Sequence, residues 1–178
     1  MNRDEIIVLN RSTLEQIALI TMPPHSGPRH GVFDASYKTL YIAAQLDNSL
    51  YVLQRPNTDS LQFSIKYTIP LLENPQKTDE TAAIRLFKNH LYISIRGSDE
   101  IVVLEITDSE PRIIQRCSSG GKHPRDIALS PDGKFLLSAN RNSGDVIAFP
   151  IDKKTGIIGN PCSQAHISQA VSIVFENK

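Results

Sequence analysis

The sequence predicts an all-β protein: a β-propeller of four-stranded antiparallel blades, incomplete as a ring. A pattern of strand, turn, strand, polar turn and strand occurs three times in the 178 residues. The second strands of the three copies begin at Leu40, Leu91 and Phe135. A spacing of about 44 to 51 residues is typical of propeller blades and of helical arrays. Because each apolar run is short and bounded by turn-forming residues, strands are favoured over helices.

The third copy shows the pattern most clearly and extends from Gly120 to Asp152. It reads GGKHPRDIALSPDGKFLLSANRNSGDVIAFPID. Three strand-like runs, RDIALS, FLLSA and VIAFPI, are separated by the turn sequences SPDGK and NRNSGD. In the first turn, Pro131 fixes its own φ, Asp132 can bond neighbouring backbone, and Gly133 supplies positive φ at no steric cost. These turn residues are interpreted as structural.

The other two copies keep the same order of strands and turns, from Arg29 to Gln54 and from Ala83 to Ile106. Each copy also leaves room for a fourth, outer strand. The predicted outer strands are Gln62–Ile69, Arg112–Cys117 and Cys162–Ile167. Four antiparallel strands per repeat make a propeller blade, and the three blades extend over about 27–70, 81–118 and 123–168.

Both ends of the chain predict pieces of further blades within a single domain, 1–178. Residues 1–24 predict a partial blade with two outer strands, Glu5–Leu9 and Gln16–Met22. Residues 12–15 (STLE) match a capping box that could open a helix, but the repeat favours a turn leading into a strand. Residues 170–176 predict an inner strand that closes a ring.

Three blades with partial blades at their sides leave strand edges open. A closed propeller has about four to eight blades, and an open edge invites pairing with another chain. Three explanations remain: the chain is part of a longer protein, it associates with itself through the open edges, or its reading frame is truncated. Two copies in one ring would give six full blades and two hybrid blades.

Composition excludes several classes of function. The formal net charge is zero and there is no basic stripe, so a nucleic-acid partner is not expected. The longest early apolar run, Ile6 to Leu9, is too short for a membrane span or a signal peptide. Cys117 and Cys162 make neither a disulfide framework nor a metal motif. We expect no metal and no cofactor, because the sequence has no acidic metal-binding cluster and no phosphate-binding glycine loop.

Polar residues recur at two positions that should meet on one face of the propeller. Neighbouring strands of a blade run in opposite directions, so the loop before the first strand and the turn after the second share a face. Such loops on a rigid scaffold often carry binding sites, and arginine and histidine suit an anionic ligand. The candidates are Arg29, His30, His123 and Arg125 before first strands, and Gln45, Arg96 and Asn140 after second strands.

Structural roles compete with these assignments. Each Pro-Arg pair could fix a turn, with its arginine paired to a neighbouring carboxylate. Gln45 and Asn140 could cap loop backbone instead of touching a ligand. His90 should lie on the opposite face and be solvated, and the charges Asp4-Glu5 and Asp99-Glu100 resemble solvated turn residues.

Three segments resemble the lactonase family of seven-bladed propellers, which includes propeller-type 6-phosphogluconolactonase and the carboxymuconate-lactonising enzyme. They are GPRHGVF, LYISIRGSDEIVVLEI and HPRDIALSPDGKFLLSANRNSGDVIAFPIDKKTG. The resemblance covers nearly the whole chain and corresponds to the C-terminal half of the family's length. Within the family, the end of the chain supplies the closing inner strand of the first blade.

The resemblance implies a cytoplasmic, cofactor-free hydrolase that opens a small anionic sugar-acid lactone in the pentose phosphate route. By the family's motifs, Arg29 and Arg125 would hold phosphate, His30 would act as general base, and Arg96 would stabilise the oxyanion. His123, Gln45 and Asn140 would complete the substrate site. The family usually has Glu at the position of Gln45 and an acidic residue at Ala83, and these differences favour the alternative of a non-catalytic binding module.

Overall fold

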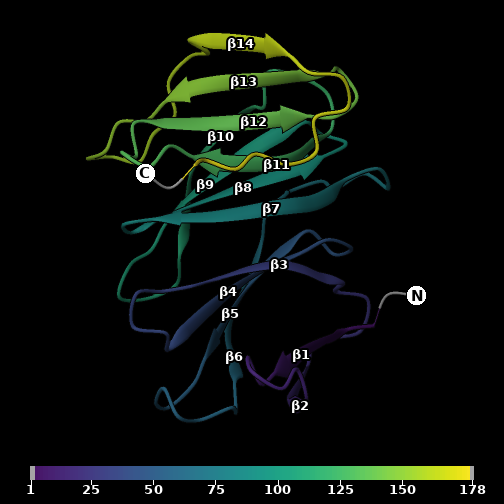
Figure 1. Ribbon diagram of the computed structural model, residues 1–178, viewed down its shortest axis with the longest axis vertical. Helices are drawn as coiled ribbons and strands as arrows, with labels where there is room; N and C mark the ends of the chain where they lie inside the picture. The colour runs from purple at the N-terminus through teal and green to yellow at the C-terminus, as the bar shows by residue number, and fades with distance from the viewer. Residues whose placement is uncertain (1–2, 177–178) are drawn as a thin grey trace.

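The structure, a computed structural model, describes residues 3–176 and is built from fourteen strands (Figure 1). No helix occurs within this range. The predicted all-β fold class is therefore confirmed. The strands are β1 (Glu5–Leu9), β2 (Gln16–Thr21), β3 (Pro28–Phe33), β4 (Thr39–Ala44), β5 (Ser49–Gln54), β6 (Ser64–Pro70), β7 (Glu80–Phe87), β8 (His90–Arg96), β9 (Glu100–Glu105), β10 (Arg112–Ser118), β11 (Pro124–Leu129), β12 (Phe135–Asn140), β13 (Asp145–Pro150) and β14 (Ser163–His166).

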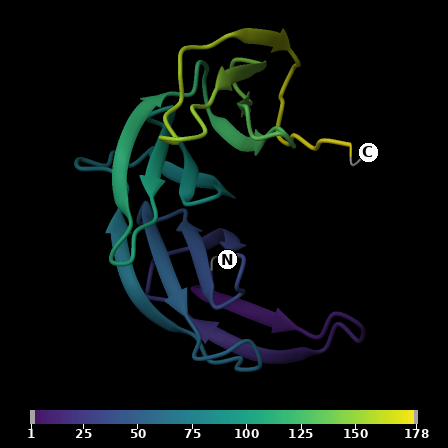
Figure 2. The same cartoon turned by 90° about the vertical axis from the view of Figure 1, so that its left-hand side faces the viewer.

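The strands form three four-stranded antiparallel sheets and one two-stranded sheet. The large sheets have the orders β3-β4-β5-β6, β7-β8-β9-β10 and β11-β12-β13-β14, and β1 pairs with β2. We call the large sheets the first, middle and third blades. The sheets follow one another along an arc whose concave side is open (Figure 2). This is an incomplete propeller.

The central strand of the middle blade shows what holds the sheets together. All seven residues of β8 are buried. Leu91 and Ile93 pack in a cluster shared with the first blade, and Tyr92 packs in one shared with the third. Full burial of such a side chain contributes about 1.5–3 kcal/mol. Apolar contact between neighbouring sheets therefore fixes the positions of the loops at their ends.

A polar residue just before β1, β5 and β9 connects the sheet that contains each of these strands to the next sheet. Asp4 accepts hydrogen bonds from the backbone N–H groups of His25 (2.8 Å) and Gly27 (2.8 Å). The Asn48 amide donates to the Asp79 carbonyl at 2.9 Å, and Asp99 accepts from the His123 N–H at 2.7 Å.

Asp4, Asn48 and Asp99 thus hold the loops that lead into β3, β7 and β11 by hydrogen bonds, and we call these three residues the latches. The expectation that Asp4 and Asp99 are solvated turn charges is wrong, because each carboxylate is bonded to the lead-in loop of the following blade.

The structure also tests two expectations about the ends of the chain, the choice between turn and helix near residue 12 and the closing strand at 170–176. Residues 12–15 contain no helix: 11–13 form a turn, in which the Asn10 side chain accepts from the N–H groups of Ser12 and Thr13, so the helix alternative is wrong. The predicted closing strand at 170–176 is also wrong, since no strand is assigned there. A strand needs a free edge to pair with, and this segment instead donates the Ile173 N–H to the Asp126 side chain.

His90 is a further correction. It lies at the start of β8, on the opposite face as predicted, but it is only 3% exposed. Its ring packs against Gly156, where even one added methyl carbon would lie 2.3 Å from the ring. Between residues 3 and 176 there is no helix of the length and apolarity needed to cross a membrane.

Candidate functional site

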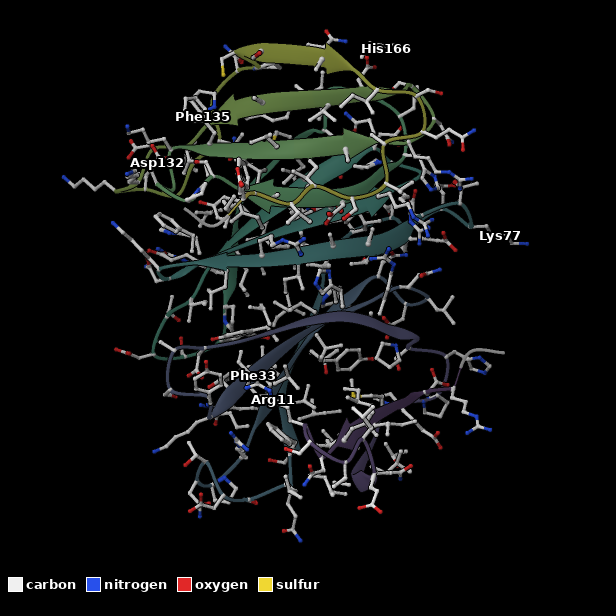
Figure 3. All side chains as sticks on the ribbon, in the orientation of Figure 1. Arg11, Phe33, Lys77, Asp132, Phe135 and His166 are labelled. Carbon is white, nitrogen blue, oxygen red and sulfur yellow. The ribbon has the colours of Figure 1, made fainter. Side chains whose placement is uncertain are left out.

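The lead-in loops and the turns after the second strands meet at one end of the blades, as the sequence predicts. Gln45 N–H donates to the Gly27 carbonyl at 2.8 Å, and Arg141 N–H donates to the His123 carbonyl at 3.0 Å. In Figure 3 this end carries Lys77, whereas Asp132 and Phe135 lie at the other end. We call the Lys77 end the entrance end.

Arg29 and Arg125 each occupy a β-bulge in the inner strand of a blade. The register of β3 against β4 shifts between Pro28 and His30, and that of β11 against β12 shifts between Pro124 and Asp126. A bulge adds an unpaired residue and re-aims its side chain, and bulges often occur beside active sites. The repeated Pro-Arg pair therefore directs two arginines in the same way.

Arg29 reaches across to the middle blade. Its Nη1 donates to the Ala82 carbonyl at 2.5 Å. Partial burial, then the charges of Arg96 and Arg125, lower the pKa of Arg29. These three arginines therefore lie close enough to repel one another.

A carboxylate that the sequence analysis did not select faces this cluster. Glu80 Oε2 lies 2.9 Å from Arg96 Nη2, and Glu80 Oε1 accepts a hydrogen bond from Gln45 Nε2 at 3.0 Å. Arg96 is only 6% exposed, and this burial lowers its pKa although Glu80 acts in the opposite direction.

The buried guanidinium of Arg96 has unused donors. Within residues 3–176, neither its Nε nor its Nη2 makes a hydrogen bond of good geometry, although Nη2 is close to Glu80. An unsatisfied buried donor costs about 1–3 kcal/mol. Nη2 is held by the charge of Glu80 at 2.9 Å, and both atoms are buried, so an oxygen atom of a ligand reaches them only after a neighbouring side chain moves.

An open cleft of about 580 Å³ adjoins these groups. Its walls include Glu80 and His123, with Lys77 and Lys122 at its rim. Burial, then Arg96 and Arg141, lower the pKa of His123, so its surroundings favour the uncharged imidazole. Its Nε2 is buried and has no partner among the described residues.

The structure corrects the register at Asn140. Phe135 pairs with Pro150 as Thr39 pairs with Gln54 and His90 with Glu105. The counterpart of Gln45 and Arg96 is therefore Arg141, one residue later.

The two side chains differ in exposure. Asn140 is fully buried, and its amide donates to the Ser119 carbonyl at 3.1 Å. Arg141 is exposed and influences both Arg96 and His123. The positive φ of Gly144, three residues after Arg141, matches those of Asn48 and Asp99 in the other blades and is the signal that identifies the equivalence.

His30 lies in a second polar group on the inner strands. Arg85 Nη1 is 3.2 Å from Nε2 and 3.4 Å from Nδ1 of His30. Burial, then the charge of Arg85, lower the pKa of His30. Arg85 also pairs with Asp126 at 2.8 Å, and Asp126 holds the Ile173 N–H at 3.0 Å.

Positive charge exceeds negative charge around the entrance end. Five arginines act on this region through the contacts and pKa shifts described above, and three carboxylates, Glu80, Asp99 and Asp126, lie among them. No group of three or more His, Cys, Asp or Glu residues with metal-site geometry occurs in the described part of the chain. The arrangement suits an anionic small molecule with oxygen atoms.

Comparisons with known proteins give consistent results. A family described as "Lactonase, 7-bladed beta-propeller" matches residues 3–175. The 6-phosphogluconolactonase of Bacillus subtilis (strain 168) is 28% identical over 156 residues, covering 85% of this chain and 45% of the relative. The chain thus spans about half the length of the curated relatives it matches.

Two solved structures are similar at comparable identity. A protein from Lactobacillus plantarum superposes with a TM-score of 0.89 at 26% identity, over 94% of this chain and 51% of that one. The periplasmic gluconolactonase of Pseudomonas aeruginosa superposes with a TM-score of 0.81 at 27% identity, over 87% and 44%.

Proposed function

Because the chain belongs to the lactonase family of seven-bladed β-propellers, we propose that it hydrolyses an anionic sugar-acid lactone, as a 6-phosphogluconolactonase does. The observation that carries the proposal is the convergence of three arginines from three blades at one entrance: Arg29, Arg96 and Arg125. Arginine binds phosphate and carboxylate through paired N–H donors. A phosphorylated sugar acid offers such groups.

The three arginines receive different roles because their surroundings differ. Arg29 and Arg125 extend from bulges, and we assign to them the phosphate of the substrate. Arg96 is buried, and its Nε has no partner among the described residues. We assign to it the carbonyl oxygen, which becomes negative when water attacks. Fixed donors in a site shielded from water stabilise such charge strongly.

The remaining residues selected from sequence keep supporting roles in the proposal. His123 and Gln45 border the substrate, and Asn140 supports the loop that carries His123 through its bond to Ser119. His30, the base expected from sequence, stays a prediction.

We place the reaction in the pentose phosphate route and the protein in the cytoplasm. The named activity of the Bacillus relative supports the route, and two free cysteines are compatible with a reducing compartment. The Pseudomonas relative is periplasmic by name. Fractionation of the source cells decides between the two compartments.

Hydrolysis of 6-phosphoglucono-δ-lactone by the purified chain tests the proposal. We expect acid release faster than the spontaneous rate, and a slower rate for Arg29→Ala. Arg11→Ala is the matched control, because Arg11 is an exposed arginine in the β1–β2 turn. Equal rates of acid release for the wild-type protein, Arg29→Ala and buffer alone would contradict the proposed lactonase activity.

Gln45 favours a second candidate function, a binding module without catalysis. An amide stands where the family usually has a carboxylate, and an amide cannot accept a proton as a base does. This function predicts that the chain binds 6-phosphogluconate while lactone hydrolysis stays at the spontaneous rate.

We also propose that two copies associate through the open sheet of β1 and β2. Its exposed apolar residues include Ile7, Leu9 and Leu19, each 46–49% exposed, and β1 has one unpaired edge among the described strands. Exposed apolar edges favour pairing. Light scattering should give the mass of a dimer, and a monomeric mass at micromolar concentration would contradict the proposal.

A further inference from the structure

We infer that Glu80 is the general base of the proposed lactone hydrolysis, an inference that rests on the proposed function. The family's usual carboxylate position holds Gln45. The structure places a carboxylate one hydrogen bond away, on the neighbouring blade: Gln45 Nε2 donates to Glu80 Oε1 at 3.0 Å. Glu80 therefore brings a carboxylate from the middle blade to the entrance end, beside an amide that cannot act as a base.

Glu80 has free capacity and access to water. An ionised carboxylate offers about four acceptor positions on its two oxygens. Gln45 occupies one of them and Arg96 lies beside another. The Glu80 side chain is 36% exposed and lines the cleft of about 580 Å³. A water molecule in the cleft can therefore donate to Glu80.

Two other carboxylates lie near the arginines, and neither combines these properties. Asp99 lines the same cleft, but its side chain is only 17% exposed, Oδ1 accepts from the His123 N–H and Oδ2 lies 3.6 Å from Lys122 Nζ.

Asp126 is outside the residues that line the cleft. Its side chain is only 11% exposed. Oδ1 accepts from Arg85 and from the Ile127 N–H, and Oδ2 accepts from the Ile173 N–H. Asp126 is therefore a structural anchor for the segment that contains Ile173.

His30 is poorly placed to take a proton. The nearly equal distances from Arg85 Nη1 to both ring nitrogens place that atom over the ring face, because an in-plane position would clash with Cε1. The Ile84 N–H also points to Nδ1 at 3.4 Å. A cation against the ring and a donor on its lone pair both oppose protonation.

The reaction then balances with residues at the entrance end. Glu80 takes a proton from water as the water oxygen bonds to the lactone carbonyl carbon. The carbonyl electron pair moves to its oxygen, which the guanidinium of Arg96 stabilises. When the intermediate collapses, the ring C–O bond breaks and the leaving oxygen takes the proton from Glu80. The product is an open-chain acid, which ionises in water.

The test compares Glu80→Gln with Glu105→Gln in the wild-type background. Glu105 is a matched control, because it pairs with Arg112 at 2.6 Å away from the entrance end and has a similar side-chain exposure of 29%. We expect Glu80→Gln to lower kcat at least about 100-fold, with KM within about threefold, and Glu105→Gln to behave as wild type. Melting curves identify any variant that is unfolded at the assay temperature.

Chemical rescue separates a base from a mere partner of Arg96. In Glu80→Ala, added formate should raise kcat at least about tenfold in a concentration-dependent way, because formate supplies the missing proton acceptor. Loss of activity without rescue would overturn the base role, and so would a Glu80→Gln variant within about threefold of wild type. If wild type itself is no faster than buffer, the proposed function fails and this inference fails with it.

Discussion

The lead-in strands of the three blades share one backbone design but carry different side chains. The first and third blades place Arg29 and Arg125 in a bulge, whereas the bulge of the middle blade holds Ala82 and Ala83. The middle blade instead provides Glu80 and Arg96, which form an ion pair. Small side chains in the central bulge leave space, and Arg29 uses it to bond the Ala82 carbonyl. Different side chains at equivalent positions of a repeat can therefore give each blade a different role in one binding site.

Removal of Arg96 should have the largest effect, because Arg96, unlike Arg29 and Arg125, is buried. We expect Arg96→Ala to lower kcat about 100- to 1,000-fold, the usual result of losing a fixed donor to an oxyanion. Steady-state kinetics measures this change. Arg112→Ala removes an exposed arginine of the same blade as a control, and equal kcat values for the two variants would remove the distinction between the blades.

Arg29→Ala and Arg125→Ala should each raise KM about 10- to 150-fold with a smaller change in kcat. The reason is that each loses a charge-assisted bond worth about 1.5–3 kcal/mol, and about 1.4 kcal/mol is a factor of ten. Unphosphorylated glucono-δ-lactone sharpens the test. Its KM should be nearly the same in wild type and in both variants, and an equal loss for both substrates would contradict the assignment to phosphate.

The shared backbone design depends on the latches, and Asp99 is the latch for the third blade. Asp99→Ala leaves the His123 N–H without its acceptor, which should cost about 1–3 kcal/mol. For a chain of this length we expect Tm to fall by roughly 2 to 10 °C. Ser98→Ala is a control next to it at an exposed site. A Tm equal to that of the control would show that the lead-in loop holds its position without the latch.

The smallest effect should appear in the pH dependence of stability. Burial lowers the pKa of His30, His90 and His123 in the folded state. Below about pH 6.5 the unfolded chain therefore binds more protons than the folded chain, so the free energy of unfolding should fall as the pH falls. Urea denaturation at pH 7.5 and 5.5 measures the difference.

His90→Gln isolates one contribution, at the opposite end of the middle blade from the entrance. Removing this buried histidine should reduce the loss of stability between the two pH values. An identical loss in the variant would show that His90 contributes nothing to it.

The repeat made much of the fold predictable. Apolar runs and turn residues indicated the four strands of each blade, and the common face of the lead-in loops and second turns followed from strand alternation. The closing strand at 170–176 was wrong because a strand requires a partner edge. The sequence did not indicate which groups Asp4 and Asp99 bind, because their hydrogen-bond partners lie about 20 residues further along the chain.

The site was harder to predict, for reasons visible at two positions. The apolar Phe135 was aligned with Leu40 and Leu91 as the start of a second strand. In the structure Phe135 is 37% exposed and is equivalent to Thr39 and His90, one residue earlier. This error of one residue in the alignment of the repeats selected Asn140 in place of Arg141. Glu80 lies before the apolar run of its strand, and its partners, Gln45 and Arg96, belong to two different blades. Strand pairing within the middle blade places Glu80 opposite Arg96, but only the packing of the first blade against it adds Gln45.

The central claim is that the three blades form one anion site. NMR of the arginine Nε–H groups during titration with 6-phosphogluconate tests it most directly. The account predicts that Arg29, Arg96 and Arg125 shift together with one Kd, while Arg11 and Arg112 do not shift. If none of the first three shifts at millimolar ligand, or if all five shift alike, the blades do not form a common site.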